Sequence, residues 1–530
     1  MTHAEIAAPV DRADPRTLLA RRRQARLRVT NAGGQRQFTA LERAERLVDQ
    51  GTFVEWAPLR LPRPGGYGPP RTGVDGDGVV TGWGAIDGGS VVVVSHDFSV
   101  SGGSIGAVFA QKVMRAQEIA IERGCPIVYI NDSGGARIHE GIEALHGCGG
   151  IFALNVRASQ VVPQISLILG PCAGAAAYSP ALTDWTIMVK AQGQMFLTGP
   201  EVVRAATGEV VEPDDIGGSE LHTRHSGVAH LEVDSETAAF AAARRLLSFV
   251  PSSVGESLPL ALPAPPDPDA AERLATVVPG SPSATFDVRA LLDGVLDEGP
   301  RLELMPTYGG SVVTTLARLD GRPVGVIANQ PRGRGGILDS ASSVKAARFV
   351  AFCGRFGLPI VTFVDVPGFL PGSVEERRGV ITHGAGLLRA YVEADVPKLT
   401  VIVRKAYGGA YIAMGSRSLG ADFAWAWAGA EIAVMGPGGA VGLLHRRELR
   451  AAEDPDALRR QLSEEYRESV TRPSLAAQLG IVDDVIFPEE TRDRLVEALD
   501  LLSPTRRTER HRTGTTTTDE RATPRRTKGD

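Results

Sequence analysis

Residues 101–135 read SGGSIGAVFAQKVMRAQEIAIERGCPIVYINDSGG, and residues 334–368 read RGGILDSASSVKAARFVAFCGRFGLPIVTFVDVPG. The two stretches align without a gap. The identical pairs, each 233 positions apart, include Gly103 and Gly336, Lys112 and Lys345, Pro126 and Pro359, and Asp132 and Asp365. We therefore interpret the two stretches as copies of one structural unit.

The repeat extends in both directions. Upstream, GVVTGWGAIDGGSVVVV (78–94) corresponds to TTLARLDGRPVGVIA (314–328). Downstream, the matching pairs are Pro163 with Pro397, Gly174 with Gly408, and Gly199-Pro200 with Gly436-Pro437. Such a period is too long for a solenoid, whose repeats span roughly 20 to 50 residues. The pattern predicts two duplicated domains, which suits a chain of 530 residues.

The composition is that of an ordinary globular protein, with 43% hydrophobic and 22% charged residues. A net charge of −5 provides no global attraction to nucleic acid or to an anionic membrane, so we expect neither as a partner. The N-terminus lacks the apolar segment of a signal peptide, and no apolar run reaches membrane-spanning length, which favours a cytoplasmic protein. The four cysteines are widely separated, which predicts reduced, packed thiols and no metal.

Changes in composition predict the domain boundaries. Residues 31–250 and 284–503 form the two domains, and the proline-rich residues 251–283 link them, because proline cannot continue a strand or a long helix. Residues 1–30 form an N-terminal extension. Residues 504–530, rich in Thr and Arg and poor in apolar residues, are expected to be a disordered tail.

Each domain shows a strand, a glycine turn, a helix and a second strand. The runs Val91–Val94 and Ile127–Ile130 are rich in β-branched residues, as expected for strands buried on both faces. Between them, apolar residues from Phe109 to Ala120 recur at helical spacing. The pattern predicts an α/β fold with helices layered around largely parallel sheets.

Small-residue turns follow the predicted strands QISLILG and LTVIVRK. The first turn is GPCAGAAAY (170–178), and the second is RKAYGGAY (404–411). Small residues allow a ligand to approach the backbone, and the free N–H groups at a helix start can bind an enolate or carbonyl oxygen. We predict two oxyanion sites, one in each domain. The alternative is that small residues merely permit tight packing of strand against helix.

Three weaker patterns have structural alternatives. The sequence Asp132-Ser133-Gly134-Gly135 is similar to the serine segment of trypsin-like proteases, but the histidine motif of that class is missing. The cluster His222, His225 and His230 lacks the spacing of a metal site, which favours packing or surface roles. The glycines of 102–106 precede a helix, yet the acidic residue of a dinucleotide site is not found.

Longer motifs carry a family resemblance. They are SHDFSVSGGSIG (95–106), NDSGGARIHEG (131–141), VVPQISLILGPCAGAAAYSPALTD (161–184), TFVDVPGFLPG (362–372), RKAYGGAYIAMGS (404–416) and AEIAVMGPGGAV (430–441). In this order, over roughly residues 41–502, the chain resembles the carboxyltransferase (β) subunit of biotin-dependent acyl-CoA carboxylases, the propionyl-CoA and acetyl-CoA branch above all.

The resemblance implies two crotonase-like domains and a hexamer, a trimer of dimers, in which the active site forms between the first half of one subunit and the second half of another. It implies that the N–H groups of Ala175 and Ala176, with Gly174 making the turn, stabilise the thioester enolate. The N–H groups of Gly409 and Ala410 would hold the carbonyl oxygen of carboxybiotin. The implied reaction transfers a carboxyl group to the α carbon of a short acyl-CoA and requires no protein nucleophile.

The resemblance and the turns also suggest residues that bind the substrate, with Arg137 meeting the phosphates of coenzyme A or, alternatively, forming a structural salt bridge. These substrate-binding residues are Gly102, Gly103, Ser133, Gly134, Gly135, Ala136, Arg137, Tyr178, Tyr411 and Ile412. The chain has no A-M-K-M biotin attachment motif and no ATP-grasp glycine loop. A carboxylase would therefore need a separate α subunit that carries the biotin carboxylase and biotin carrier domains.

The chain departs from the common family pattern at two positions. Ala175 replaces the second glycine of A-G-G-A, and Ile412 stands where propionyl-CoA and acetyl-CoA carboxylases often carry Asp. The stretch GGAYIAMGS looks more like the decarboxylase and transcarboxylase members. Two alternatives therefore remain, a decarboxylase of a malonyl-type thioester or related β-keto acid, and a non-catalytic scaffold subunit.

Overall fold

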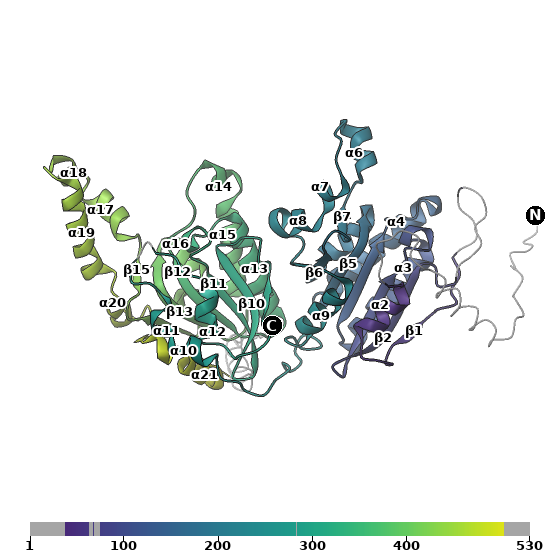
Figure 1. The fold of residues 1–530 in the computed structure, drawn as a ribbon, viewed down its shortest axis with the longest axis horizontal. Coiled ribbons are helices and arrows are strands. Elements are labelled where there is room, and N and C mark those ends of the chain that lie inside the picture. The colour runs from purple at the N-terminus through teal and green to yellow at the C-terminus, as the bar shows by residue number, and fades with distance from the viewer. Residues whose placement is uncertain (1–37, 63–66, 68–74, 282–283, 503–530) are drawn as a thin grey trace, which may run out of the picture.

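Two eight-stranded sheets of the same design form the structure (Figure 1). The computed structural model describes residues 38–62, 67, 75–281 and 284–502, and the predictions for residues 1–30 and 504–530 lie outside this part. The first sheet contains β1 (Val54–Trp56), β2 (Val79–Ile86), β3 (Gly89–His96), β4 (Ile127–Ser133), β5 (Gln164–Ala173), β6 (Trp185–Val189), β7 (Gln194–Phe196) and β8 (Leu231–Val233). The second contains β9 (Leu302–Leu304), β10 (Val312–Leu319), β11 (Arg322–Asn329), β12 (Ile360–Val366), β13 (Lys398–Tyr407), β14 (Phe423–Trp427), β15 (Glu431–Ala433) and β16 (Asp484–Ile486).

The strand order repeats as the sequence repeat predicts. The first sheet runs β1-β2-β3-β4-β5-β6-β8 with β7 paired to β5, and the second runs β9-β10-β11-β12-β13-β14-β16 with β15 paired to β13. In each sheet the first three strands are antiparallel neighbours, and the remaining pairs are parallel. The predicted α/β class and duplication are confirmed.

Helices cover the sheets or protrude from them. In the first half they are α2 (Ala40–Leu47), α3 (Ala107–Arg123), α4 (Ile142–Ala158), α5 (Tyr178–Ala181), α6 (Pro200–Thr207), α7 (Pro213–Gly217), α8 (Ser219–Leu221) and α9 (Glu236–Leu247). The remaining helices are α10 (Pro268–Glu272), α11 (Leu274–Val277), α12 (Val288–Asp293), α13 (Ser340–Arg355), α14 (Ser373–Arg377), α15 (Val380–Glu393), α16 (Gly408–Ala413), α17 (Pro437–Leu444), α18 (Arg446–Ala451), α19 (Pro455–Val470), α20 (Pro473–Gln478) and α21 (Thr491–Leu501). The predicted strand–helix–strand unit is β3-α3-β4 in the first half and β11-α13-β12 in the second. None of the helices in the described ranges is long and apolar enough to cross a membrane.

The two halves pack against each other through the start of β6 and one face of α13. The Trp185 ring meets Phe352 edge-on, with ring centroids 4.8 Å apart, and Phe349 at 6.3 Å. At the rim of this contact, Arg355 donates to Asp184 at 2.8 Å. Burial raises the pKa of the Asp184 carboxyl to about 6. Buried aromatic contacts and an ion pair therefore tie the halves together.

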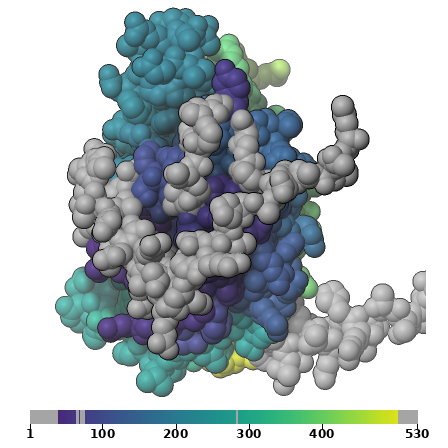
Figure 2. Space-filling view, turned by 90° about the vertical axis from the view of Figure 1, so that its right-hand side faces the viewer, coloured from purple at the N-terminus to yellow at the C-terminus, as the bar shows by residue number. Residues whose placement is uncertain are grey.

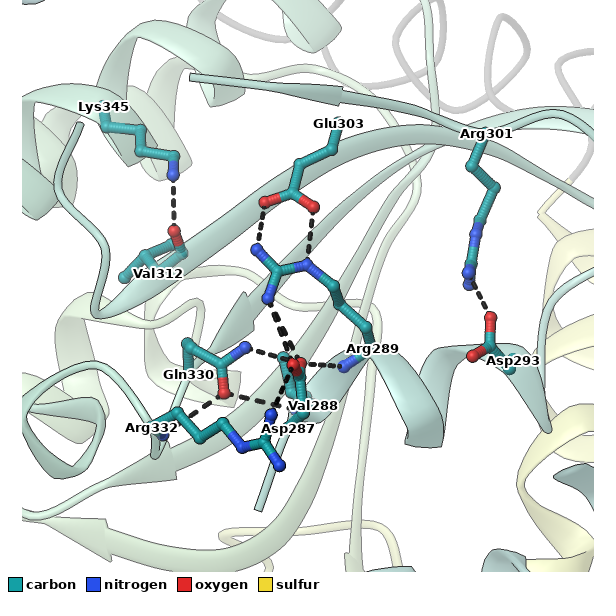
Figure 3. A network of polar contacts seen from close by, with 10 residues as sticks. All are labelled: Asp287, Val288, Arg289, Asp293, Arg301, Glu303, Val312, Gln330, Arg332 and Lys345. Atoms are coloured by element: carbon teal, nitrogen blue, oxygen red, sulfur yellow. Dashed lines mark hydrogen bonds and ion pairs between the residues drawn. The ribbon is translucent and has the colours of Figure 1, made fainter. Parts of the chain in front are cut away.

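The duplicated lysines Lys112 and Lys345 have matching structural roles. Both ammonium groups are buried and donate to backbone carbonyls where the second strand of each half begins, at Val79 and Val312. Lys345 also donates to the Met305 carbonyl at 2.8 Å. Figure 3 shows the Lys345–Val312 bond beside the ion pair of Arg289 with Glu303, whose atoms lie 2.6 Å apart. The repeated lysine thus anchors helix to sheet.

We expect Lys345 to make stability depend on pH. Burial lowers its pKa to about 7, well below the value of roughly 10.4 that an unfolded chain gives it. Between these values the unfolded chain binds more protons, so stability rises with pH across this window, and below about pH 7 the folded state bears the full cost of the buried charge. The free energy of unfolding of the parent, relative to a Lys345→Met variant, should rise between pH 7 and 10. An unchanged difference would contradict this assignment.

Candidate active site

Two equivalent turns follow the longest strand of each sheet. Strand β5 leads into a 3₁₀ turn, η3 (Gly174–Ala177), and β13 leads into α16. Gly174 and Gly408 have φ values of 56° and 60°, in the left-handed region that favours glycine. The sharp reversal after each strand therefore depends on these residues, as the sequence predicts. In the described structure no side chain caps either helix start, which leaves backbone N–H groups available.

Gly409, unlike Gly408, has a backbone conformation that does not require glycine. Its φ is not positive, and a Cβ atom built on it would meet nothing within 4 Å. The fold therefore does not need a glycine at 409, and the missing side chain leaves open space at the start of α16. The equivalent position in the first half is Ala175, whose methyl group occupies part of the corresponding space beside the first turn.

An apolar cavity of about 490 Å³ opens beside Gly409. Its walls come from the loop before α14, from α14 and α15, and from Gly409 at the start of α16. Glu376 is its only charged lining residue in the described structure. The apolar residues that line it are Phe369, Leu370, Pro371, Val380, Ile381, Ala385 and Leu388. A ligand with an apolar body and one polar oxygen directed at the turn would fit this surface.

On the first half, the structure brings most predicted residues together. The N–H of Gly134 donates to the Gly102 carbonyl at 2.8 Å, and the N–H of Ile105 donates to the Gly135 carbonyl at 2.8 Å. Gly135, with φ of 101°, lies against the turn, since a Cβ there would come within 2.8 Å of the Ala173 oxygen. The glycine segment, residues 102–106 and 133–137, and the turn after β5 therefore form one surface. Gly103, Ser133 and Ala136 belong to the same glycine segment, and Gly103 packs onto the Asp132 backbone too closely to carry a side chain.

Arg137 forms a structural salt bridge, which the sequence analysis gave as the alternative to a phosphate contact. Its side chain is 3% exposed, and its guanidinium pairs with Asp77 at 2.5 Å and with Glu140 at 2.8 Å. These carboxylates also accept from the start of α3, Glu140 from the N–H of Ala107 and Asp77 from that of Phe109. These bonds leave the guanidinium little capacity for a phosphate. They also fill the helix N-terminus, which argues against the dinucleotide alternative.

Tyr178 and Ile412 occupy equivalent positions, four residues after Gly174 and Gly408. Tyr178 is 49% exposed and meets Phe152 edge-on, with ring centroids 5.9 Å apart. Ile412 is 41% exposed, whereas its neighbour Tyr411 is partly buried, and burial raises the pKa of the Tyr411 phenol to about 12. Each half thus presents one large side chain beside its turn.

The other candidate motifs have packing or surface roles, and His225 is exposed. Ser133 accepts the N–H of Gly135 at 3.2 Å, His222 contacts the Met195 carbonyl at 2.6 Å, and buried His230 accepts from the N–H of Thr186 at 2.8 Å. Within the described ranges, no group of His, Cys, Asp or Glu side chains is arranged to hold a metal ion. The four cysteines are free and buried.

Sequence reasoning missed the buried charges that support the turns. Asp132 on β4 and Asp365 on β12 are equivalent residues, and each lies where the pairing register of its strand shifts. Asp132 forms an ion pair with Arg43 at 2.9 Å, and Asp365 forms one with Arg404 at 2.7 Å. Arg404 is on the strand that carries its turn, but Arg43 comes from α2. The first-half equivalent of Arg404 is Gly170, and a Cβ there would clash with the Asp132 carboxylate.

Arg43 has a second buried partner. Its guanidinium also pairs with Glu236 at 2.6 Å, and all three side chains of this cluster are at most 2% exposed. Cys172, one residue before the end of β5, donates to the Ala176 carbonyl at 3.3 Å and so fastens the turn after β5 to the strand. The repeated aspartates signalled a shared role, but only the fold reveals the partners.

Comparison with known proteins identifies the family of this chain. The carboxyl transferase domain model matches residues 33–514. The chain is 49% identical to the propionyl-CoA carboxylase carboxyltransferase subunit of Haloferax mediterranei, covering 91% of this chain and 93% of that protein. It is 46% identical to the methylmalonyl-CoA decarboxylase subunit alpha of Veillonella parvula, over 90% and 92%. The transcarboxylase 12S structure with methylmalonyl-coenzyme A and methylmalonic acid bound has a TM-score of 0.87 at 42% identity, over 100% of this chain and 99% of that one.

Proposed function

Because this chain belongs to the carboxyl transferase domain family, with its duplicated crotonase-like fold, we propose that it is the carboxyltransferase subunit of a biotin-dependent acyl-CoA carboxylase. It is an enzyme that transfers a carboxyl group to the α carbon of a short-chain acyl-CoA. The observation that carries the proposal is the pair of equivalent turns, each with uncapped N–H groups at the end of a parallel strand.

The turn after β5, Gly174–Ala177, is the acyl-side turn and binds the thioester. The N–H groups of Ala175 and Ala176 stabilise the negative charge that develops on the thioester oxygen when the α proton leaves. The glycine segment around Gly102 and Gly135 allows the pantetheine arm to lie against backbone. Because these donors are fixed by Gly174 and supported by Cys172, they need no reorganisation during the reaction.

The turn after β13, at Gly408–Ala410, is the biotin-side turn and fits a carboxybiotin delivered by a partner. The open space over Gly409 admits a ureido ring, the N–H groups of Gly409 and Ala410 can hold its carbonyl oxygen, and the apolar cavity accommodates its alkyl portion. When bound, carboxybiotin supplies the carboxyl group and, after release of CO₂, the base for the α proton. The partner we propose is an α subunit with biotin carboxylase and biotin carrier domains.

A second copy of the chain completes the site. The two turns lie on different sheets, and each half exposes apolar side chains on the helix beside its turn. On α4 these are Ile142, Leu145 and Val156, exposed by 76%, 53% and 51%, and on α15 they are Ile381 and Val392, exposed by 75% and 60%. Covering these surfaces with the opposite half of a second copy would place an acyl-side turn against a biotin-side turn. We propose a hexamer built as a trimer of such dimers.

Reconstitution tests the function. The purified protein, mixed with its biotinylated partner, ATP, bicarbonate and propionyl-CoA, should form methylmalonyl-CoA. The decarboxylase alternative gives the opposite result, with no product in that mixture and release of CO₂ from methylmalonyl-CoA without ATP.

The Ile412→Asp variant tests the acyl preference. Ile412 lies beside the turn assigned to biotin, and in the proposed dimer it would border the acyl group held by the second copy. An apolar residue there favours longer chains, since each buried methylene contributes about 0.8 kcal/mol, or roughly four-fold in kcat/KM. Asp at 412 should shift the preference toward acetyl-CoA by about this factor per methylene. The measurement is kcat/KM for acetyl-, propionyl- and butyryl-CoA, and unchanged ratios would refute the role of Ile412.

A further inference from the structure

Three hydrogen-bonded side chains tie the biotin-side turn to the helices that protrude from the second half. Tyr407, the residue before Gly408, donates its hydroxyl to the Glu431 carboxylate on β15. The other oxygen of Glu431 accepts from Arg467 on α19 at 3.0 Å. In Figure 1, α17, α18 and α19 extend away from the second sheet, and the Arg467 side chain is 34% exposed. The three residues therefore form a chain from the molecular surface to the start of the turn.

The Tyr407 side chain is fixed by packing as well as by its hydroxyl. It is 7% exposed, and a Cβ atom on Gly436 would lie 3.0 Å from its ring. Burial, with Glu431 beside it, raises the pKa of the Tyr407 phenol above its ordinary range, so the hydroxyl remains a hydrogen-bond donor. Gly436 directly precedes α17, so the ring also lies against the base of the protruding helices.

A second bond holds the same segment from the opposite edge of the strand. The N–H of Lys405 donates to the carboxylate of Asp365, which lies on β12, at 3.1 Å. Strands β12 and β15 flank the end of β13. Carboxylates thus hold both edges of the last three residues of β13, just before Gly408 reverses the chain.

The equivalent residues of the acyl-side turn cannot form these bonds. Pro171 occupies the position of Lys405 and has no N–H to donate. Ala173 occupies the position of Tyr407 and has no hydroxyl. The first turn is fastened instead by the Cys172 thiol, which bonds within the turn itself.

The first half also uses the equivalent of Glu431 differently. This residue is Gln194 on β7, and it donates to Asp214 on α7 at 2.8 Å. Figure 2 shows the protruding helices α6 and α7 of this half at its top. The amide thus ties β7 to the protrusion and not to the turn, so the chain through Tyr407 distinguishes the biotin side from the acyl side.

We propose that Tyr407 is a positioning residue of the reaction, which fixes the direction of the Gly409 and Ala410 N–H groups. The proposal rests on the proposed function, in which these groups hold the carbonyl oxygen of carboxybiotin. The negative charge on this oxygen is larger in the transition state than in the bound ligand, so the direction of the donors affects the rate more than the binding. Tyr407 acts through the backbone that follows it.

Removal of one hydroxyl tests this role. Tyr407→Phe keeps the ring against Gly436 and removes only the bond to Glu431. The matched control, Tyr391→Phe, removes the hydroxyl of another buried tyrosine of the second half, which bonds Thr362 at 2.9 Å. Two variants change the acceptor, because Glu431→Gln keeps an oxygen for the Tyr407 hydroxyl and Glu431→Leu does not.

Carboxylation with the biotinylated partner gives the first readout. Loss of a whole oxyanion donor costs about 10²–10³ in kcat, so a displaced donor in Tyr407→Phe should cost less, about 10-fold. The KM for propionyl-CoA should not change, because the acyl-side turn is untouched. Glu431→Leu should match Tyr407→Phe, Glu431→Gln should retain more activity, and Tyr391→Phe should keep the kcat of the parent. The losses should not add in the double variant Tyr407→Phe with Glu431→Leu, since both changes remove the same bond.

Amide hydrogen exchange gives a second readout, which needs no substrate. Residues 405–416 include the bond from the Met414 N–H to the Ala410 carbonyl, at 3.1 Å. Exchange across this segment should be at least about three-fold faster in Tyr407→Phe than in the parent or in Tyr391→Phe. Exchange across residues 171–182, which contain the acyl-side turn, should be the same in all three proteins.

An unchanged kcat in Tyr407→Phe would overturn the proposal, with or without faster exchange, and so would an equal loss of kcat in Tyr391→Phe. A higher KM for propionyl-CoA would also contradict it. A parent protein that forms no methylmalonyl-CoA would refute the proposed function, whereas the exchange comparison would still decide whether Tyr407 holds the turn. The two failures are therefore distinguishable.

Discussion

Carboxyl transfer is expected to fall by at least about 100-fold in a Gly409→Val variant that unfolds at the same temperature as the parent. The valine side chain would enter the open space over the biotin-side donors and push the ligand oxygen out of reach of the N–H groups of Gly409 and Ala410. Loss of a single oxyanion donor costs about 10²–10³ in kcat, which sets the scale. The measurements are steady-state carboxylation with the biotinylated partner and thermal unfolding.

Two further variants complete this test. Gly409→Ala adds one methyl group and should lose less activity than the valine variant. Gly310→Val makes the same exchange at an exposed loop glycine whose Cβ would also meet nothing within 4 Å, and it should leave carboxylation unchanged. Full activity of Gly409→Val would refute the biotin-side assignment, and a lower unfolding temperature would mean that the fold itself needs the glycine.

An Arg43→Met variant is expected to lose about 3–5 kcal/mol of folding free energy. The change leaves Asp132 and Glu236 buried without the guanidinium that lies 2.9 Å and 2.6 Å from them. The variant removes the positive charge that offsets the desolvation cost of both carboxylates, while Glu236 keeps its hydrogen bond from Gln192 at 2.7 Å. Chemical denaturation at fixed protein concentration measures the loss, since subunit assembly contributes to apparent stability.

Arg244→Met is the matched control. Arg244 also bridges two carboxylates, Asp49 at 2.8 Å and Asp87 at 2.6 Å, but its side chain is 28% exposed. Partly exposed ion pairs contribute at most about 1 kcal/mol, so the control should lose much less stability. Equal losses in the two variants would show that burial does not set the cost at Arg43.

The repeat predicted most of the architecture. Matches such as Asp132 with Asp365 predicted that both halves have the same strand order, because duplicated domains keep the same backbone path even where their side chains differ. Gly174 and Gly408 were predicted as turns from small residues after an apolar strand, and the positive φ angles confirm the turns. The assignment of donors to Ala175 and Gly409 remains a prediction.

The sequence did not predict the contacts between segments that are far apart in the chain. Arg137 stands in a glycine-rich loop, where a phosphate contact was as plausible as an ion pair, and only the position of Asp77 favours the ion pair. The partnership of Arg43 with Glu236 joins residues 193 positions apart, and no local pattern marks it.

The different origins of the two buried arginines bear on the order of folding. Arg404 and Asp365 are 39 positions apart on neighbouring strands, whereas Arg43 and Asp132 are separated by 89 and belong to a helix and a strand. Closing the longer loop costs more chain entropy, by about 0.7 kcal/mol from length alone. The second half can neutralise its buried carboxylate as soon as β12 and β13 pair, but the first half must wait for α2 to dock. We therefore expect that two halves with one architecture fold at different speeds, the second before the first.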